Sequence, residues 1–435
     1  MEQLSLDRQP ERPGRPAEPS PGSAGGPPRA PRTIEPATEE EVARALAEAT
    51  AASLAVLPRG GGSQWGLGEP PRAGDLVLSL AGLRGVVEHA PEELVVRVLA
   101  GTPLEELNRF LAAHGQWLPV EPVAAPGATV GGLLATGAAG ARRLAFGTPR
   151  DMTTGLRFVL PDGRVMHNGA RVVKNVAGYD VMRLLIGSLG TLAVLTEAWL
   201  RVRPLPARRE TLLLAEEGPL EALDLGRRRI VAELLPTAVE LLDAGAAARL
   251  GLPARSTLAV ALEGDAPGVA YQRERIARLA AEATGGAAAP GLERLEAESS
   301  DAFWRAFHQE LPAGSGLVVR AGVTLAELPA LLAASLETGL EAARVAGAGH
   351  GVLRLFASPA EDDEALDEWA LFLRRWRARA EALGGSAVVE KAPDRLRPRF
   401  PAWGTPPPSI GLMRAVKARF DPRGVLNPGR FVGGI

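Results

Sequence analysis

The sequence predicts an α+β fold in which a glycine-rich N-terminal domain precedes a second domain of alternating strands and helices. Two glycine-rich loops, each beside short apolar runs, mark the first domain. Apolar runs that alternate with longer helical patterns mark the second domain. Prolines at positions 204 and 206, and again between 401 and 408, separate the folded parts of the chain.

The chain has 435 residues and a net charge of −2, and its length predicts two or three domains. Residues 1–33 are rich in proline and glycine and cannot bury a core, so we expect a disordered tail there. Residues 34–205 then form the first domain and residues 206–400 the second. Residues 401–435 form a C-terminal segment.

Composition narrows the class of protein. The nearly balanced charge gives no electrostatic reason to expect a nucleic-acid partner. No long window is continuously apolar and the N-terminus lacks a signal peptide's apolar core, so we expect no transmembrane helix and a cytoplasmic location. The absence of cysteine excludes disulfides, thiolate nucleophiles and cysteine-ligated iron–sulfur clusters in this chain. The five histidines lack metal-motif spacing.

In the first domain, Thr38 precedes three glutamates and an apolar pattern, which indicates a capped helix start. Thr102 and the residues after it indicate a second capped start, and Pro161-Asp-Gly163 indicates a turn. Short apolar runs predict the strands. In chain order we expect a helix at 38–52, strands at 54–57, 75–80, near 86 and at 94–99, helices at 102–114 and 133–139, a strand at 156–160, a short helix after 180 and a strand at 190–202.

The second domain alternates apolar runs with helical patterns. We expect strands at 257–263, 316–323, 352–357 and 387–389, and helices at 269–283, 325–338 and 362–383. A last helix at 409–420 is expected in the C-terminal segment.

Two glycine-rich loops carry the functional signal. Glycine leaves room for a ligand against the backbone, and successive N–H groups form a concavity that suits a phosphate. The first loop contains Pro58, Arg59, Gly60, Gly61, Gly62 and Ser63, and the second contains Pro126, Gly127, Ala128, Thr129, Gly131 and Gly132.

Neither loop matches a common nucleotide motif. Trp65 stands where a dinucleotide fingerprint beginning at Gly60 needs its third glycine, and no lysine follows a glycine as a P-loop requires. We therefore expect the two loops to cradle one elongated ligand, and a dinucleotide with a pyrophosphate fits that arrangement.

Together with Phe146-Gly-Thr-Pro-Arg-Asp151, Gly187-Ser-Leu-Gly-Thr-Leu192 and the segment 420–429, the two loops resemble the FAD-binding domain of the PCMH-type (vanillyl-alcohol oxidase) family. The resemblance implies a two-subdomain FAD-binding domain followed by an α+β cap domain. It also implies a C-terminal segment that returns to the FAD-binding domain, and FAD as the cofactor.

The resemblance assigns FAD-binding roles by position. The loop backbones would bind the pyrophosphate, Thr129 would add a hydroxyl donor, and Asn427 would approach the flavin ring. Ser63 stands where some relatives carry a histidine that attaches flavin, so noncovalent FAD is implied. The full set is Pro58, Arg59, Gly60, Gly61, Gly62, Ser63, Pro126, Gly127, Ala128, Thr129, Gly131, Gly132, Gly147, Thr148, Asp151, Gly190, Thr191, Val194 and Asn427.

The segments 173–180 and 183–188 are similar to the E subunit of bacterial glycolate oxidase. Lys174 and Tyr179 in the first of them are interpreted as structural support. The similarity implies oxidation of a small 2-hydroxy acid to a 2-oxo acid, in a complex with a related flavin-type subunit and an iron–sulfur subunit. Any association with a membrane would come through these partners. A stand-alone FAD-dependent alcohol or hydroxy-acid oxidoreductase and a flavin-binding structural subunit without turnover remain alternatives.

The metal-binding motif of related 2-hydroxy-acid dehydrogenases is absent. At the best alignment, residues 345–352, valine replaces both histidines and Ala348 replaces the aspartate, while Glu390-Lys391 replaces a Glu-His pair. No metal is therefore implied, and a general base must come from elsewhere. The candidates for catalysis or carboxylate binding are His350, Arg320, Arg354 and Lys391.

Overall fold

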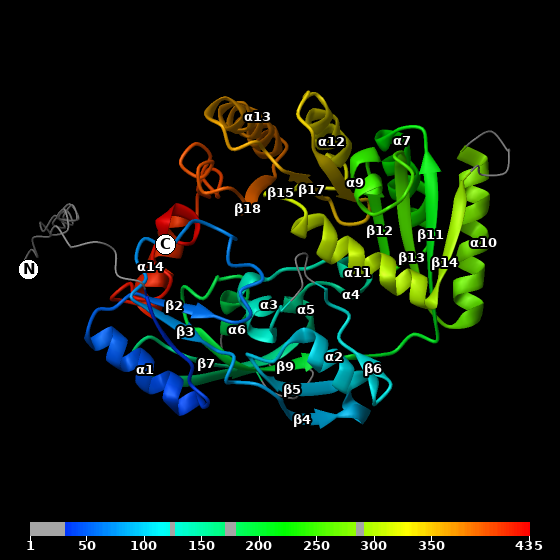
Figure 1. Cartoon of the computed structure of the whole chain (residues 1–435). Helices are drawn as coiled ribbons and strands as arrows, with labels where there is room; N and C mark the ends of the chain where they lie inside the picture. Colours follow the sequence, from blue (N-terminus) through cyan, green and yellow to red (C-terminus); the bar gives the residue numbers. More distant parts are fainter. Residues whose placement is uncertain (1–30, 122–126, 170–179, 284–290) are drawn as a thin grey trace, which may run out of the picture. The chain divides into compact units, whose positions relative to one another are not determined.

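The computed structural model describes residues 31–121, 127–169, 180–283 and 291–435 (Figure 1). Most of the predicted disordered tail lies outside these residues. Arg32 and Thr33, which the sequence assigned to the tail, belong to the strand β1 (Arg32–Ile34) and pair with β3. We call residues 31–205 the N-terminal region, 206–400 the central region and 401–435 the C-terminal segment.

The N-terminal region begins with a three-stranded parallel sheet in the order β1-β3-β2, where β2 is Val56–Arg59 and β3 is Leu76–Ser79. Helix α1 (Glu39–Ala51) packs against it and shares its apolar cluster. The Thr38 hydroxyl accepts from Glu41 N–H at 3.2 Å, as the sequence predicted for a capped start.

The region also contains a five-stranded antiparallel sheet in the order β4-β5-β9-β7-β8 and a two-stranded antiparallel sheet of β6 and β10. The predicted capped start at Thr102 is wrong, because its hydroxyl binds Gly85 N–H instead and Pro103 precedes the helix. The strands are β4 Val86–Ala90, β5 Val95–Leu99, β6 Gln116–Trp117, β7 Thr153–Val159, β8 Val165–Gly169, β9 Val194–Arg201 and β10 Arg203–Pro204. The helices are η1 Pro91–Glu93, α2 Leu104–Ala112, α3 Val130–Thr136, α4 Arg143–Phe146, α5 Pro149–Met152 and α6 Val181–Leu185.

The central region is built on one eight-stranded sheet in the order β14-β11-β13-β12-β16-β17-β15-β18, with antiparallel pairs throughout. The sequence did not predict four of these strands, β11, β12, β14 and β16. Strand bounds are β11 Arg208–Glu216, β12 Ala238–Leu242, β13 Ser256–Gly264, β14 Leu292–Glu296, β15 Leu317–Gly322, β16 Ala343–Gly347, β17 Val352–Ala357 and β18 Ser386–Lys391.

Helices cover the two faces of this sheet unequally. Helices α7 (Pro219–Asp224), α10 (Ala266–Ala283), α12 (Leu328–Leu336) and α13 (Asp363–Ala382) share one apolar core with the first face. Helices α9 (Ala244–Arg249) and α11 (Ala297–Ala313) cover part of the second face. The remaining helical turns are η2 Leu225–Ile230 and α8 Val231–Glu233.

The rest of the second face carries polar side chains and meets the N-terminal region. Arg320 on β15 lies directly opposite Arg354 on β17, and Glu390 on β18 binds both. Helix α4 of the N-terminal region contacts β12. Val388 packs in one cluster with Leu67 and Leu189. A site between the two regions therefore has charged groups on one wall.

The C-terminal segment returns to the N-terminal region, as predicted, after helix α14 (Ile410–Phe420) (Figure 1). Val56 N–H donates to the Val425 carbonyl at 2.8 Å, and Asn427 N–H donates to the Val56 carbonyl at 3.0 Å. A last turn, η3 (Val432–Gly434), ends the chain.

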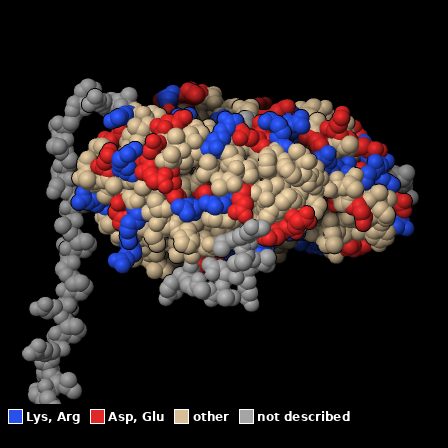
Figure 2. All heavy atoms as spheres, turned by 90° about the horizontal axis from the view of Figure 1, so that it is seen from below, with Lys and Arg blue, Asp and Glu red and all other residues tan. Residues whose placement is uncertain are grey.

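On the face shown in Figure 2, the described acidic and basic residues are interspersed rather than gathered by sign. No helix among the described residues combines the length and the apolar character that a membrane span requires.

Candidate functional site

The two glycine-rich loops meet in space. A Cβ on Gly61 would lie 1.6 Å from the Gly127 carbonyl oxygen, and one on Gly60 would lie 2.2 Å from Thr129 Oγ1. Both loops line one hollow, which also includes Asn427 and Arg430. Only glycine permits this close approach of backbones, so the predicted juxtaposition of two remote loops is present in the structure.

Asn427 closes the hollow from the C-terminal segment. Its Nδ2 donates to the Leu189 carbonyl at 2.7 Å, whereas its buried Oδ1 has no partner among the described residues. Both Asn427 and Leu189 have positive φ, 41° and 54°, which is strained for residues other than glycine. A buried amide oxygen left without a donor is costly, so this position suits a ligand that donates a hydrogen bond.

Lys417 fixes this part of the C-terminal segment. Its ammonium donates to the carbonyls of Thr191 and Leu426 at 2.7 and 2.9 Å and pairs with buried Asp421 at 2.7 Å. The loop that contains Gly190 and Thr191 and the strand-like segment before Asn427 are therefore held to one cation.

Two arginines that the sequence did not single out hold the segment after the glycine triplet. Arg430 donates to the Trp65 carbonyl at 2.6 Å and stacks on its ring, and Arg397 donates to the carbonyls of Gly66 and Gly68 at 3.0 Å. Burial, together with the charge of Arg397, lowers the pKa of Arg430 to about 10. No carboxylate among the described residues pairs with Arg430, which lines the hollow between the loops, and its free positive charge suits a diphosphate.

Other predicted FAD-binding residues lie outside this hollow. Thr148 and Asp151 form a capping box at the start of α5 beside Gly147, and hydrogen bonds from Thr148 hold the pKa of Asp151 below its usual value. The side chains of Thr191 and Val194 are buried. Gly131 packs on Ala100. Pro126, Lys174 and Tyr179 lie outside the described residues.

The four candidates for catalysis or carboxylate binding have different surroundings. Glu390 accepts from Arg320 Nε at 2.9 Å and from Arg354 Nε at 3.0 Å. Burial opposes ionisation of Glu390, but the two arginines outweigh it and lower its pKa. His350 Nε2 lies 2.7 Å from Glu240 Oε1, and Lys391 contacts the Pro312 carbonyl at 3.4 Å.

Arg143 at the start of α4 is a further cation that sequence reasoning missed. Burial lowers its pKa, and the nearby Arg354 and Arg320 lower it further. It makes no ion pair within the described part of the chain. Within the same residues, no group of three histidine or acidic side chains is arranged to hold a metal ion.

Glycine loops in contact, a buried amide oxygen without a donor and Arg430, which has no carboxylate partner among the described residues, suit a nucleotide cofactor with a diphosphate. Residues 30–169 match the family described as "FAD binding domain", and residues 205–431 match "FAD linked oxidases, C-terminal domain". The chain belongs to the FAD-linked oxidase family. It is an FAD-dependent oxidoreductase, and the residues of the site fit that cofactor.

Similar proteins agree with this assignment. The chain is 28% identical to glycolate oxidase subunit GlcD of Bacillus subtilis over 413 residues, which cover 91% of this chain and 88% of that protein. It is 44% identical to glycolate oxidase subunit GlcE of Escherichia coli over 139 residues, or 32% of this chain and 39% of that protein. A solved alkyldihydroxyacetonephosphate synthase shares the fold, with a TM-score of 0.67 at 18% identity over 92% of this chain and 77% of that one.

Replacing Arg430 with methionine should weaken FAD binding about tenfold or more, because a charge-assisted hydrogen bond contributes roughly 1.5–3 kcal/mol. Titration of the FAD-free protein, followed by flavin fluorescence, measures the change. Arg414→Met is the matched control, since exposed Arg414 donates to the Gly433 carbonyl but does not line the hollow. Equal affinities in the two variants would contradict a diphosphate role for Arg430.

Proposed function

We propose that this protein is the FAD-binding subunit of a glycolate dehydrogenase-like complex and oxidises a small 2-hydroxy acid to a 2-oxo acid. The observation that carries the proposal is the group of cations on the second face of the central sheet and on helix α4 of the N-terminal region beside it. Glu390 binds Arg320 and Arg354, whereas Arg143 and Lys391 have no carboxylate partner within the described residues. The surplus positive charge suits a substrate carboxylate.

Each of these residues has a role in the proposal. Arg143 and Lys391 bind the carboxylate, and Glu390 holds Arg320 and Arg354 beside it. Bound FAD supplies the hydride acceptor. His350 Nε2 lies 2.7 Å from Glu240 Oε1, whereas its Nδ1 has no partner among the described residues. We infer that this nitrogen takes the hydroxyl proton.

Partners are part of the proposal. The chain has no cysteine and cannot itself ligate an iron–sulfur cluster through thiolates. Two similar proteins are named as subunits of glycolate oxidase. We infer that a related flavin-type subunit and an iron–sulfur subunit receive the electrons, in the cytoplasm or at a membrane reached through those partners.

Anaerobic mixing of the FAD-loaded protein with 2-hydroxy acids tests the function. We expect the flavin absorbance to bleach when a 2-hydroxy acid is added. Bleaching without partners shows that the flavin of this chain itself meets the substrate, and sustained turnover without partners would favour the stand-alone oxidoreductase. A flavin that no hydroxy acid reduces, with or without the partner subunits, would contradict the proposal and favour the structural subunit.

A further inference from the structure

A cavity of about 590 Å³ lies where the segment after the glycine triplet meets the central region. Residues 62–71 form one wall, and the end of α11 and the end of β18 form another. Gly62, Ser63 and Trp65 line both this cavity and the hollow between the glycine loops. The cavity therefore begins where the proposed FAD-binding backbone ends.

The walls of this cavity are mainly apolar. Trp65, Leu67 and Pro70 line it from the N-terminal region, and Pro312 and Val318 line it from the central region. The Trp65 residue is 39% exposed, although its large ring gains by leaving water. The volume falls in the range of about 300–1,000 Å³ that small-molecule sites occupy. Size and lining together indicate a site for an apolar group.

Lys391 supplies an available positive charge in this cavity. Its ammonium contacts the Pro312 carbonyl oxygen, and no carboxylate pairs with it within the described residues. The other charged groups of the wall are engaged or solvated: Glu390 is held by two arginines, Glu69 accepts from Ala402 N–H at 2.6 Å, Arg397 donates to two carbonyls, and Asp394 is fully exposed.

We propose that this cavity takes a 2-hydroxy acid whose substituent is apolar and larger than that of glycolate, with its carboxylate on Lys391. The inference rests on the proposed function and narrows its substrate class. Glycolate has no side chain and would leave the apolar walls in water, whereas a branched or aromatic substituent covers them. C2 of the acid loses a hydride to FAD and its hydroxyl loses a proton, which leaves the 2-oxo acid.

Calorimetry on the FAD-loaded full chain measures binding of two product acids, glyoxylate and 4-methyl-2-oxopentanoate. We expect the larger acid to bind at least tenfold more tightly. Lys391→Met should weaken its binding at least tenfold, and Lys391→Arg should restore most of the loss, since arginine keeps the cation.

A pair of matched substitutions on α11 tests the apolar wall. Ala313→Phe fills the cavity and should lower the preference for the larger acid at least tenfold. Ala302→Phe places the same ring on an exposed position of the same helix outside the cavity, and should leave the preference unchanged. Circular dichroism on all variants confirms that each is folded.

The outcomes separate the inference from the proposed function. If glyoxylate binds as tightly as the larger acid, or if Ala313→Phe and Ala302→Phe have the same effect, the inference is overturned even when hydroxy acids bleach the flavin. If the larger acid binds tightly and depends on Lys391 and on the wall, the cavity assignment stands. In that case a flavin that no hydroxy acid reduces contradicts only the proposed function.

Discussion

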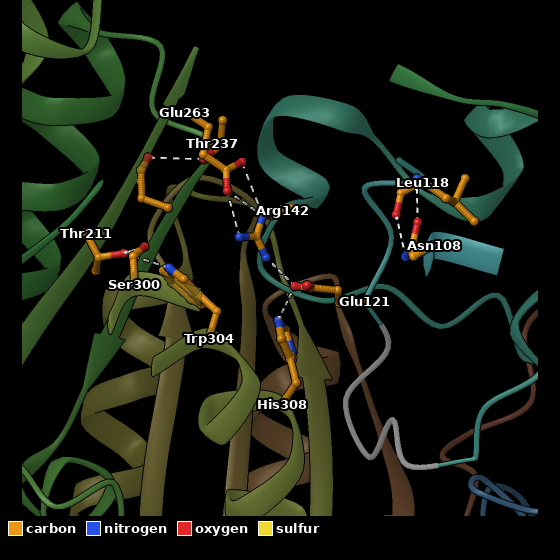
Figure 3. Close-up of polar contacts among 11 residues, drawn as sticks. Asn108, Leu118, Glu121, Arg142, Thr211, Thr237, Glu263, Ser300, Trp304 and His308 are labelled. Atoms are coloured by element: carbon orange, nitrogen blue, oxygen red, sulfur yellow. Dashed lines mark hydrogen bonds and ion pairs between the residues drawn. The ribbon is translucent and has the colours of Figure 1, made fainter. Parts of the chain in front are cut away.

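Replacing Arg142 with methionine is expected to destabilise the protein by about 3–5 kcal/mol, because removal of one partner leaves buried charges uncompensated. The Arg142 side chain is only 4% exposed and donates to Glu263 through Nη2 at 2.6 Å and through Nε at 3.0 Å. It also binds Glu121 and faces the ring of Trp304 (Figure 3). The ring of Trp117 lies 5.3 Å from its guanidinium carbon. Thermal unfolding and denaturant titration measure the loss.

The position of this arginine gives the substitution a second consequence. Glu121 and Arg142 belong to the N-terminal region, whereas Glu263 lies on β13 and His308 on α11 of the central region (Figure 3). Arg143, the proposed carboxylate ligand, is the next residue along the chain. We therefore expect Arg142→Met to raise the KM for a hydroxy acid as well as to lower stability.

Arg84→Met is the matched control, since Arg84 also pairs with a glutamate but both partners are solvent-exposed or partly so. Exposed ion pairs contribute little to stability, so the loss at Arg84 should be much smaller than the loss at Arg142. A second variant that adds Glu263→Gln to Arg142→Met should recover part of the loss, because the amide carries no buried charge. Equal destabilisation by Arg84→Met and Arg142→Met would show that the buried network does not support the fold.

The ion pairs of Arg142 also make the stability of the folded protein depend on pH. Burial raises the pKa of Glu121, but Arg142 and His308 outweigh it and hold that pKa at about 2, below its usual 4.5. Because the folded-state pKa is depressed, this contribution to stability is complete above about pH 5 and disappears as the pH falls toward 2. We expect the Arg142→Met protein to lose less of its remaining stability over that interval.

Elements whose signals are local could be predicted from the sequence. Helix α1 follows from Thr38 and the three glutamates after it, and the turn at 161–163 follows from its Pro-Asp-Gly residues. Strand β14 lacks such a signal, since its residues, Leu-Glu-Arg-Leu-Glu, do not alternate between apolar and charged side chains and four of the five are exposed. Its pairing with β11 is long-range, and no local pattern specifies it.

The candidate site was predictable to the same extent. The glycine-rich loops can be recognised in the sequence because the need for glycine arises from the conformation of their own backbone. Nothing in the sequence distinguishes Arg430 and Arg143 from other arginines. An arginine indicates an anion site only where no carboxylate pairs with it, and the sequence does not reveal which arginines lack such a partner. Arg430 meets Trp65 across most of the chain, and Arg143 meets Arg320 and Arg354 on strands of the central region. These contacts exist only in the folded protein.

Gly61→Ala is expected to lower FAD affinity at least about 100-fold, a loss of roughly 2.7 kcal/mol. The new Cβ would lie 1.6 Å from the Gly127 carbonyl oxygen, which belongs to backbone and cannot rotate away. The two loops must therefore separate, and the N–H groups proposed to bind the diphosphate lose their common geometry. The flavin content of the purified protein and titration with FAD measure the effect.

Gly316→Ala is the matched control, because a Cβ there meets no atom within 4 Å and its φ is not positive. It should leave FAD affinity unchanged. Far-ultraviolet circular dichroism should show that the Gly61→Ala protein stays folded, since neither Gly61 nor Gly127 belongs to an apolar cluster of the core. A Gly61→Ala protein that binds FAD as the parent does would mean that contact between the loops is irrelevant to the cofactor.

Gly127→Ala separates steric from conformational effects at the same contact. Its Cβ would lie 3.8 Å from the Gly61 carbonyl, which is ordinary contact, but its φ of 74° disfavours any side chain. The cost is then backbone strain of about 1–2 kcal/mol, smaller than the effect of the Gly61 clash. Because both substitutions disturb the same pair of touching loops, the double variant should lose less affinity than the sum of the two single losses. Additive losses would indicate that each loop binds FAD independently.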